Sequence, residues 1–131
     1  MGNKMAAVAR GAGTDSIDCT DGAKGTPCLF DSGGNPIMWM WDVPTVQKTE
    51  ACSSTVFVNG IGVIRNGDIM TSHPDGTICT SSPVDHSPAL SSFSATVFAD
   101  GKNVGRLGDK YDSDGHCDHT VSSGSPSVFA G

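Results

Sequence analysis

Aromatic residues are scarce in this sequence, and long apolar runs are missing. Only 6% of the 131 residues are aromatic, and no stretch approaches the roughly 20 apolar residues of a membrane-spanning helix. No window carries apolar residues at helical spacing over three turns. The 17 glycines and seven prolines favour short strands and turns instead. We therefore expect an all-β protein with a thin core and almost no helix.

Positive charge is also in short supply. Eight Lys and Arg stand against 14 Asp and Glu, which gives a formal net charge of −6. Nucleic acids and anionic membranes attract basic surfaces, so neither is an expected partner. The first residues, MGNKMAAVARGAG, contain no apolar run of signal-peptide length. We expect synthesis in the cytoplasm, without export by the general secretory route.

The five cysteines cannot all pair within one chain, because their number is odd. In a protein made in the cytoplasm, thiolate ligands explain cysteines better than a complete disulfide framework does. A bound metal is therefore the leading hypothesis for their role.

Two stretches of the sequence are nearly the same. Residues 55–68 read TVFVNGIGVIRNGD, and residues 96–109 read TVFADGKNVGRLGD. Apolar residues alternate around Asn-Gly or Asp-Gly, which is the strongest short-range signal of a β-hairpin. Each copy predicts an outgoing strand, a tight turn and a return strand that ends in Arg-x-Gly-Asp.

A third copy is divided between the two ends of the chain. AAVARGAG, at residues 6–13, matches a return strand, and SPSVFAG, at residues 125–131, matches an outgoing strand. Pairing them completes a third hairpin and closes a ring that removes exposed strand edges. We predict a small three-sided conical β structure, one domain over residues 1–131 with an insertion at about 23–50. Two similar hairpins in a β-sandwich are the alternative.

With these repeats the sequence resembles the PAAR-repeat proteins, the pointed tips of phage tail spikes and type VI secretion spikes. The resemblance covers residues 5–22 and 51–131. The Pro-Ala-Ala-Arg tetrapeptide that names the family reads AVAR, GVIR and NVGR here, without the proline. The first Gly-Asp reads Gly13-Thr14-Asp15.

This resemblance implies a monomer whose base caps a trimeric β-helical spike, one tip per trimer, without homo-oligomer formation. It also implies a metal near the apex, usually held by three histidines and one cysteine. The expected role is structural and not enzymatic: a tip that helps pierce the target cell envelope, with transient membrane contact. The expected location is the baseplate of a phage tail, or alternatively a type VI-like secretion system. Two further hypotheses are an adaptor that links the spike to a separately encoded toxin or tail protein, and a small zinc hydrolase.

Positions within the repeats predict the metal ligands. Six residues beyond Gly13 lies Cys19, and six beyond Gly67 lies His73; x-Asp-Gly follows each of them. Two further histidines lie a short way before an outgoing strand. The predicted ligand set is Cys19, His73, His86 and His119. One thiolate and three imidazoles suit a tetrahedral Zn²⁺ ion, with iron as the second choice.

The remaining cysteines leave alternatives open. Cys79 or Cys117 can replace Cys19 as the thiolate ligand. A Cys28–Cys79 disulfide is also possible in an extracellular particle. Cys52 is expected to be a small buried residue.

The insertion contains both tryptophans, in the run Met38-Trp39-Met40-Trp41. We expect it to form local core that covers one side of the cone. The alternative is an interface with the spike or a neighbouring tail protein, since aromatic residues and Met are favoured there. Three phenylalanines at equivalent repeat positions are expected either in the core or toward a partner-facing base: Phe57, Phe98 and Phe129.

Overall fold

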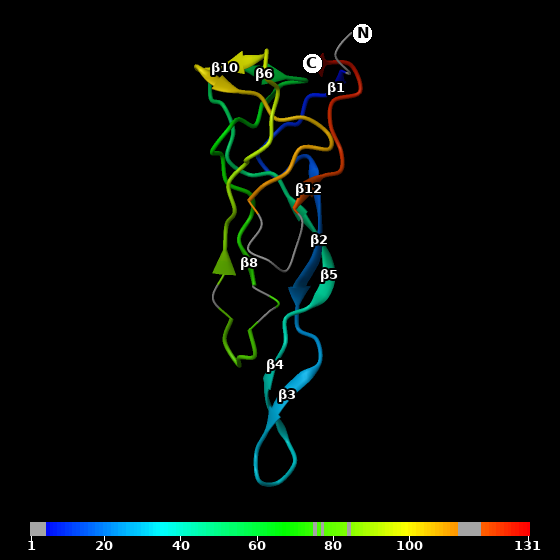
Figure 1. Ribbon diagram of the computed structural model, residues 1–131, viewed down its shortest axis with the longest axis vertical. Helices are drawn as coiled ribbons and strands as arrows, with labels where there is room; N and C mark the ends of the chain where they lie inside the picture. Colours follow the sequence, from blue (N-terminus) through cyan, green and yellow to red (C-terminus); the bar gives the residue numbers. More distant parts are fainter. Residues whose placement is uncertain (1–4, 75, 77, 84, 113–118) are drawn as a thin grey trace.

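The computed structural model describes residues 5–74, 76, 78–83, 85–112 and 119–131, without the side chains of residues 19–21. Every regular element in this part of the chain is a β-strand, which confirms the predicted fold class. Within the same residues, no helix has the length and apolarity that a membrane span requires. The molecule is elongated: β6, β10, β1 and the C-terminus lie at one end, and β3 and β4 form the other (Figure 1).

Three short antiparallel hairpins build the broad end. Two of them turn on Asn59-Gly60 and Asp100-Gly101, whose φ angles of 55°, 79°, 54° and 77° suit a tight two-residue hairpin turn. The third joins the two ends of the chain, and the amide of Val8 donates to the carbonyl of Val128 at 2.9 Å. The pairs are β6 (Phe57–Val58) with β7 (Ile61–Gly62), β10 (Phe98–Ala99) with β11 (Lys102–Asn103), and β1 (Ala6–Ala7) with β13 (Phe129–Ala130). The predicted pairing of the terminal strands is confirmed.

A closed ring of backbone hydrogen bonds ties the three units together. The amide of Ala9 donates to the carbonyl of Gly105 at 3.0 Å, Gly105 donates to Ile64 at 2.9 Å, and Ile64 donates back to Ala9 at 3.1 Å. These residues occupy the same place in the three repeats, between the valine and the arginine. The ring gives the broad end pseudo-threefold symmetry.

The core follows this axis and is thin. Ala9, Ile64 and Gly105 differ in size, and Ile64, which is fully buried, fills the space beside the glycine. Below them lies one cluster of buried apolar residues, completed by Ile17, Met70, Leu90, Tyr111 and Val121. A second cluster, nearer the hairpins, comprises Val8, Val58, Val63, Ala99, Val104 and Ala130.

Each unit carries one arginine held by the aspartate of its Gly-Asp element. In every copy the guanidinium donates through two nitrogens to the two carboxylate oxygens, a geometry that makes the ion pair strong and directional. The Nε to Oδ2 distances are 3.0 Å for Arg10–Asp15 and 2.9 Å for both Arg65–Asp68 and Arg106–Asp109. The pair Arg10–Asp15 confirms that Gly13-Thr14-Asp15 is the first Gly-Asp element.

Asp15 shows the electrostatic balance of such a pair. Burial raises the pKa of its carboxyl group, but hydrogen bonds from the side chain and amide of Arg10 and from Ser123, together with the charge of Arg10, outweigh burial. The net result is a pKa below the ordinary value of an aspartate. The ionised carboxylate of Asp15 is therefore the form that stabilises the fold.

Turn residues link each hairpin to its neighbours. Asn59 accepts from the guanidinium of Arg10 at 3.0 Å, and Asp100 accepts from that of Arg65 at 2.9 Å. Repeat-equivalent serines add to these links: Ser125 donates to Asn59, Ser53 donates to Asp100, and Ser94 donates to the carbonyl of Gly131. Neighbouring units are thus joined through side chains as well as through the backbone ring.

The insertion extends the molecule away from the hairpins. β2 (Ser16–Ala23) pairs on one side with β5 (Val43–Lys48) and on the other with β12 (Thr120–Val121). Beyond them, β3 (Pro27–Phe30) and β4 (Pro36–Trp39) form a hairpin that ends the molecule (Figure 1).

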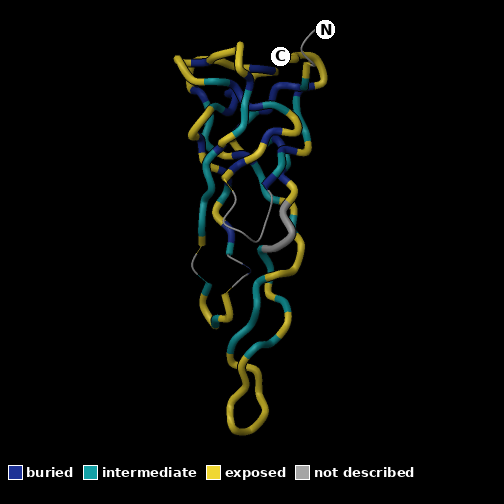
Figure 2. Tube along the Cα trace, viewed as in Figure 1, coloured by how far each residue is buried: buried dark blue, intermediate teal, exposed yellow. Residues whose placement is uncertain are grey.

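The expectation that the insertion forms local core was wrong. Of residues 23–50, the bounds predicted for the insertion, Thr49 alone is buried, and the β3–β4 hairpin is exposed or half-buried (Figure 2). A single hairpin offers no second layer against which its apolar side chains can pack. The tryptophans use their polar and π surfaces instead: the ammonium of Lys24 lies 3.3 Å from the Trp39 ring centre, and the Trp41 indole donates to the carbonyl of Thr80.

Candidate metal centre

Three histidines from two segments of the chain converge below the hairpin ring. β8 (His73–Pro74) and β9 (Asp85–His86) form a short antiparallel pair in which His73 and His86 lie directly opposite each other. His119 immediately precedes β12, whose pairing with β2 fixes its position. His73 and His119 are buried, with 2% and 0% of their surface exposed, and His86 is half-buried.

The three imidazoles present their Nε2 atoms to one another. Nε2 of His73 lies 3.0 Å from Nε2 of His119 and 2.9 Å from Nε2 of His86. One ligand atom from each ring lies within 4.8 Å of the others. Two ligand atoms of one tetrahedral zinc ion are about 3.3 Å apart, given zinc to nitrogen distances of about 2.0–2.1 Å. Small side-chain shifts bring the three nitrogens to that spacing.

The outer nitrogens of two rings indicate which tautomer is present. Nδ1 of His73 lies 3.2 Å from the carbonyl oxygen of Thr71, and Nδ1 of His119 lies 3.2 Å from that of Asp112. A carbonyl oxygen only accepts, so each Nδ1 carries the proton. A neutral imidazole has one N–H group, and Nε2 of each ring therefore bears a lone pair.

This tautomer makes the cluster a cation site. The Nε2 atoms of His73 and His119 face each other at 3.0 Å, so in this tautomer both lone pairs can be directed at one cation. A positive ion between the two rings is attracted by both. The two carbonyl contacts are also the outer-sphere hydrogen bonds that orient histidine ligands and raise their basicity. Three close histidines can thus bind a metal ion, which confirms this part of the predicted site.

The predicted fourth ligand falls in part outside the described structure. Cys19 lies in β2 opposite Thr45, but its side chain is outside the described part of the chain. Cys117, one of the two alternatives, is likewise outside the described residues. Cys79, the other alternative, is bonded to Cys28 in a disulfide and offers no thiolate. The possible Cys28–Cys79 disulfide is confirmed.

Cys52 remains a free thiol. It is half-buried and packs against the core cluster that contains Ile64 and Tyr111. The hydroxyl group of Tyr111 is buried and has no hydrogen-bond partner among the described residues. Burial is the main reason that the pKa of Tyr111 is raised, and the nearby carboxylates of Asp68 and Asp15 raise it further.

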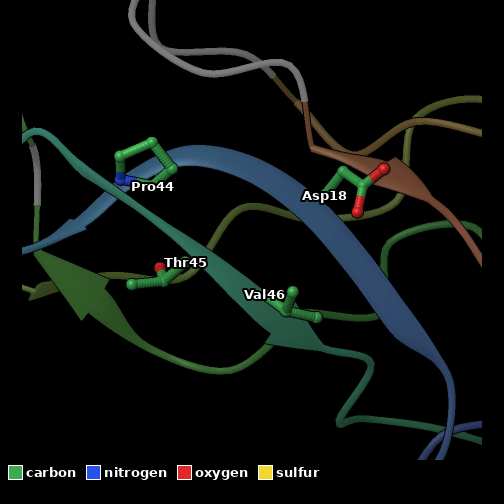
Figure 3. A pocket seen from close by; sticks show the side chains of 4 residues that line it. All are labelled: Asp18, Pro44, Thr45 and Val46. Atoms are coloured by element: carbon green, nitrogen blue, oxygen red, sulfur yellow. The ribbon is translucent and has the colours of Figure 1, made fainter.

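The carbonyl groups of Thr71 and Asp112 were missed at the sequence level, because backbone acceptors carry no residue-type signal. One surface pocket was not predicted either. It is a hollow of about 270 Å³ on the β2–β5 pair, lined by Asp18, Pro44, Thr45 and Val46 (Figure 3). Among these four lining residues, Asp18 carries the ionisable group.

No protein-family model matches the chain, and no curated protein matches it.

Proposed function

We propose that this protein is the metal-stabilised structural apex of a contractile tail spike, similar to the PAAR-repeat tips. One observation carries the proposal: three repeat-equivalent phenylalanines are exposed together at the broad end. Phe57, Phe98 and Phe129 have 57%, 55% and 50% of their surface exposed. Each belongs to one of the three hairpins, at the end opposite to the β3–β4 hairpin (Figure 1).

The neighbouring valines enlarge this apolar base. Val56, Val97 and Val128 are equivalent in the repeats and are all exposed. Exposed apolar side chains gathered at one end of a molecule are typical of an interaction site. Three similar faces around an axis complement a partner with threefold symmetry, such as the blunt end of a trimeric β-helix. One chain then caps three partner chains. A homotrimer of this protein would bury the same apolar base that the spike needs, so the isolated protein is proposed to be a monomer.

The metal of the histidine cluster is proposed to be zinc, with iron as the second choice. Imidazole nitrogens suit zinc, which prefers a tetrahedral set of four ligands. Cys19 is the proposed fourth ligand, because its strand, β2, pairs with the strand that follows His119. Four protein ligands leave no open position, so the metal has a structural and not a catalytic role.

The position of the cluster explains why a metal is needed. The buried apolar clusters lie at the broad end, and the narrower part of the molecule is mostly half-buried or exposed (Figure 2). Where little apolar volume is available, coordination bonds replace the missing core. A rigid narrow end suits a tip that penetrates a cell envelope, and the proposed location is therefore the spike of a phage tail or of a type VI-like system.

Binding to a trimeric β-helical spike fragment tests the proposal. The triple substitution Phe57→Ser, Phe98→Ser and Phe129→Ser removes the apolar base, and we expect about 100-fold or greater loss of affinity. The matched control removes three exposed apolar side chains at the opposite end: Leu29→Ser, Phe30→Ser and Ile37→Ser. The control should bind like the wild type. Equal binding by both variants would exclude the hairpin base as the docking surface.

The far hairpin favours a second candidate function, the adaptor. Leu29, Phe30 and Ile37 on β3 and β4 are exposed, with 44%, 52% and 41% of their surface accessible. Such residues can hold a separately encoded toxin or tail protein while the base binds the spike. In that case the control variant above loses the second partner and keeps the spike. If the variant retains every partner of the wild type, the adaptor function is rejected.

A further inference from the structure

One disulfide connects the insertion to the segment that joins two of the metal-binding histidines. Cys79 lies in the connection between β8 and β9, and so between His73 and His86 in the chain. Its partner, Cys28, lies in β3, 51 residues earlier, with 6.1 Å between the Cα atoms. The histidine hairpin and the insertion are therefore covalently linked.

Hydrogen bonds beside the disulfide hold the same two segments together. The amide of Trp39 donates to the carbonyl of Thr80 at 3.1 Å, and the amide of Thr80 donates to the carbonyl of Trp39 at 3.1 Å. The indole of Trp41 also donates to the carbonyl of Thr80, at 3.2 Å. These bonds extend the link from β3 to the end of β4 and to Trp41, which follows β4 in the chain.

The insertion also supports the third histidine. Thr120, the residue after His119, pairs with Asp18 of β2, and β2 leads directly into the insertion. One framework, made of β2, β3, β4 and β5, thus reaches both halves of the metal centre. It reaches His119 through a strand pair, and it reaches the His73–His86 hairpin through the disulfide and the Thr80 contacts.

We propose that the Cys28–Cys79 disulfide is a positioning element for the metal centre, so that the affinity for the metal depends on the redox state of this pair. The inference rests on the proposed metal function of the three histidines. On the side of the hairpin ring, the β8–β9 pair is continued by the amide of Met70, which donates to the carbonyl of Pro88 at 3.0 Å, and by the Ser72–Ser87 hydroxyl contact at 2.6 Å. On the opposite side, where Cys79 lies, the disulfide and the Thr80 contacts fix the segment to the insertion. Without the disulfide, the segment around Cys79 has more conformational freedom, metal binding must restrict it further, and the lost conformational entropy lowers the affinity.

The redox step requires an oxidant, and a small disulfide such as oxidised glutathione supplies it. The thiolate of one cysteine attacks the small disulfide, releases one reduced thiol and forms a mixed disulfide. The second cysteine then displaces the other thiol, so that two protein thiols become one disulfide and two molecules of reduced glutathione form. A chain in a reducing compartment therefore binds its metal more weakly than the same chain in an oxidising one.

Zinc affinity of the full-length protein tests the proposal. Competition with a chromogenic chelator gives the dissociation constant for three samples: oxidised wild type, wild type reduced with a phosphine that is removed under argon, and Cys28→Ser/Cys79→Ser. Loss of outer-sphere support typically weakens metal binding 10- to 100-fold. We expect a loss of that size in the reduced protein and in the double variant. Cys52→Ser is the matched control, and it should keep both the affinity and its redox dependence.

Folding is checked in each sample from the amide NMR signals of the broad end, which contains neither cysteine of the disulfide. Equal zinc affinity in the oxidised and reduced states overturns the proposal, as does tighter binding after reduction. If the oxidised wild type binds no zinc, the metal centre itself is refuted, and this inference falls with it. The first two outcomes leave the proposed metal centre intact, so the two failures are distinguishable.

Discussion

Gly105 and Ile64 test whether the three repeats share one packed axis. A Cβ atom added at Gly105 would lie 2.6 Å from Cγ1 of Ile64 and 2.6 Å from Cδ2 of Leu90. Both neighbours are buried, with 0% and 1% of their surface exposed, and have little room to move. Overpacking of this kind costs about 1–3 kcal/mol. Alanine also reduces the conformational entropy of the unfolded chain, which stabilises the folded state by about 0.4–1 kcal/mol. We expect Gly105→Ala to lower the free energy of unfolding by about 1–2 kcal/mol.

The double variant makes the test specific. Ile64→Ala alone leaves a cavity and should cost about 2–5 kcal/mol. Ile64→Ala with Gly105→Ala places alanine at all three repeat-equivalent positions, since the first copy already has Ala9. The new methyl group then enters the space that Ile64 vacated. The loss should be smaller than the sum of the single losses by about 1 kcal/mol or more.

Urea unfolding of the variants measures these values, with the m-value as a check that the unfolded states are comparable. The control is Gly33→Ala in the far hairpin, where the added Cβ would meet only side-chain atoms, at 3.3 and 3.4 Å. It should change stability by less than about 0.5 kcal/mol. Additive effects of the Ile64 and Gly105 substitutions would refute the shared axis.

Three further predictions concern the ring closure, the metal and acid stability. Deleting residues 125–131 removes the strand that pairs with the Val8 segment, so melting of the whole domain should shift downward; unchanged melting would refute the ring closure. His73→Ala should reduce bound zinc to well below one per chain by elemental analysis, and acidification should release zinc from the wild type because protons compete for the imidazoles. If Cys19→Ser retains the metal, Cys19 is not the fourth ligand. Because the pKa of Asp15 is lowered, its ionised form adds stability above about pH 4 that is lost as the pH falls through the folded-state pKa. Urea unfolding of Asp15→Asn between pH 5 and pH 2 should show a flatter pH dependence than the wild type, and an equal slope would contradict the role given to Asp15.

The repeat made the broad end predictable from the sequence. Alternation around Asn59-Gly60 and Asp100-Gly101 specifies local hairpins, and the divided third copy requires the termini to pair. Repeat positions also brought His73 into the predicted ligand set. His86 and His119 followed from their distance to the next outgoing strand, and the structure brings all three together.

The insertion was less predictable, because it has no counterpart in the other repeats. Its Met-Trp alternation indicates a strand but does not say what the strand packs against. The partner is Thr80, about 40 residues away in sequence, and nothing local specifies that contact. The disulfide was left open for the same reason, since the connectivity of five cysteines does not follow from their spacing. The packing of Ile64 against Gly105 likewise depends on the tertiary structure, and the local sequence around either residue does not indicate it.

The mass of the complex with a trimeric spike fragment tests the central claim most directly. Light scattering should show the isolated protein as a monomer and its mixture with the fragment as one chain per three spike chains. A stable homotrimer of the isolated protein, or no complex with the cognate spike, would contradict the proposed role as a spike apex.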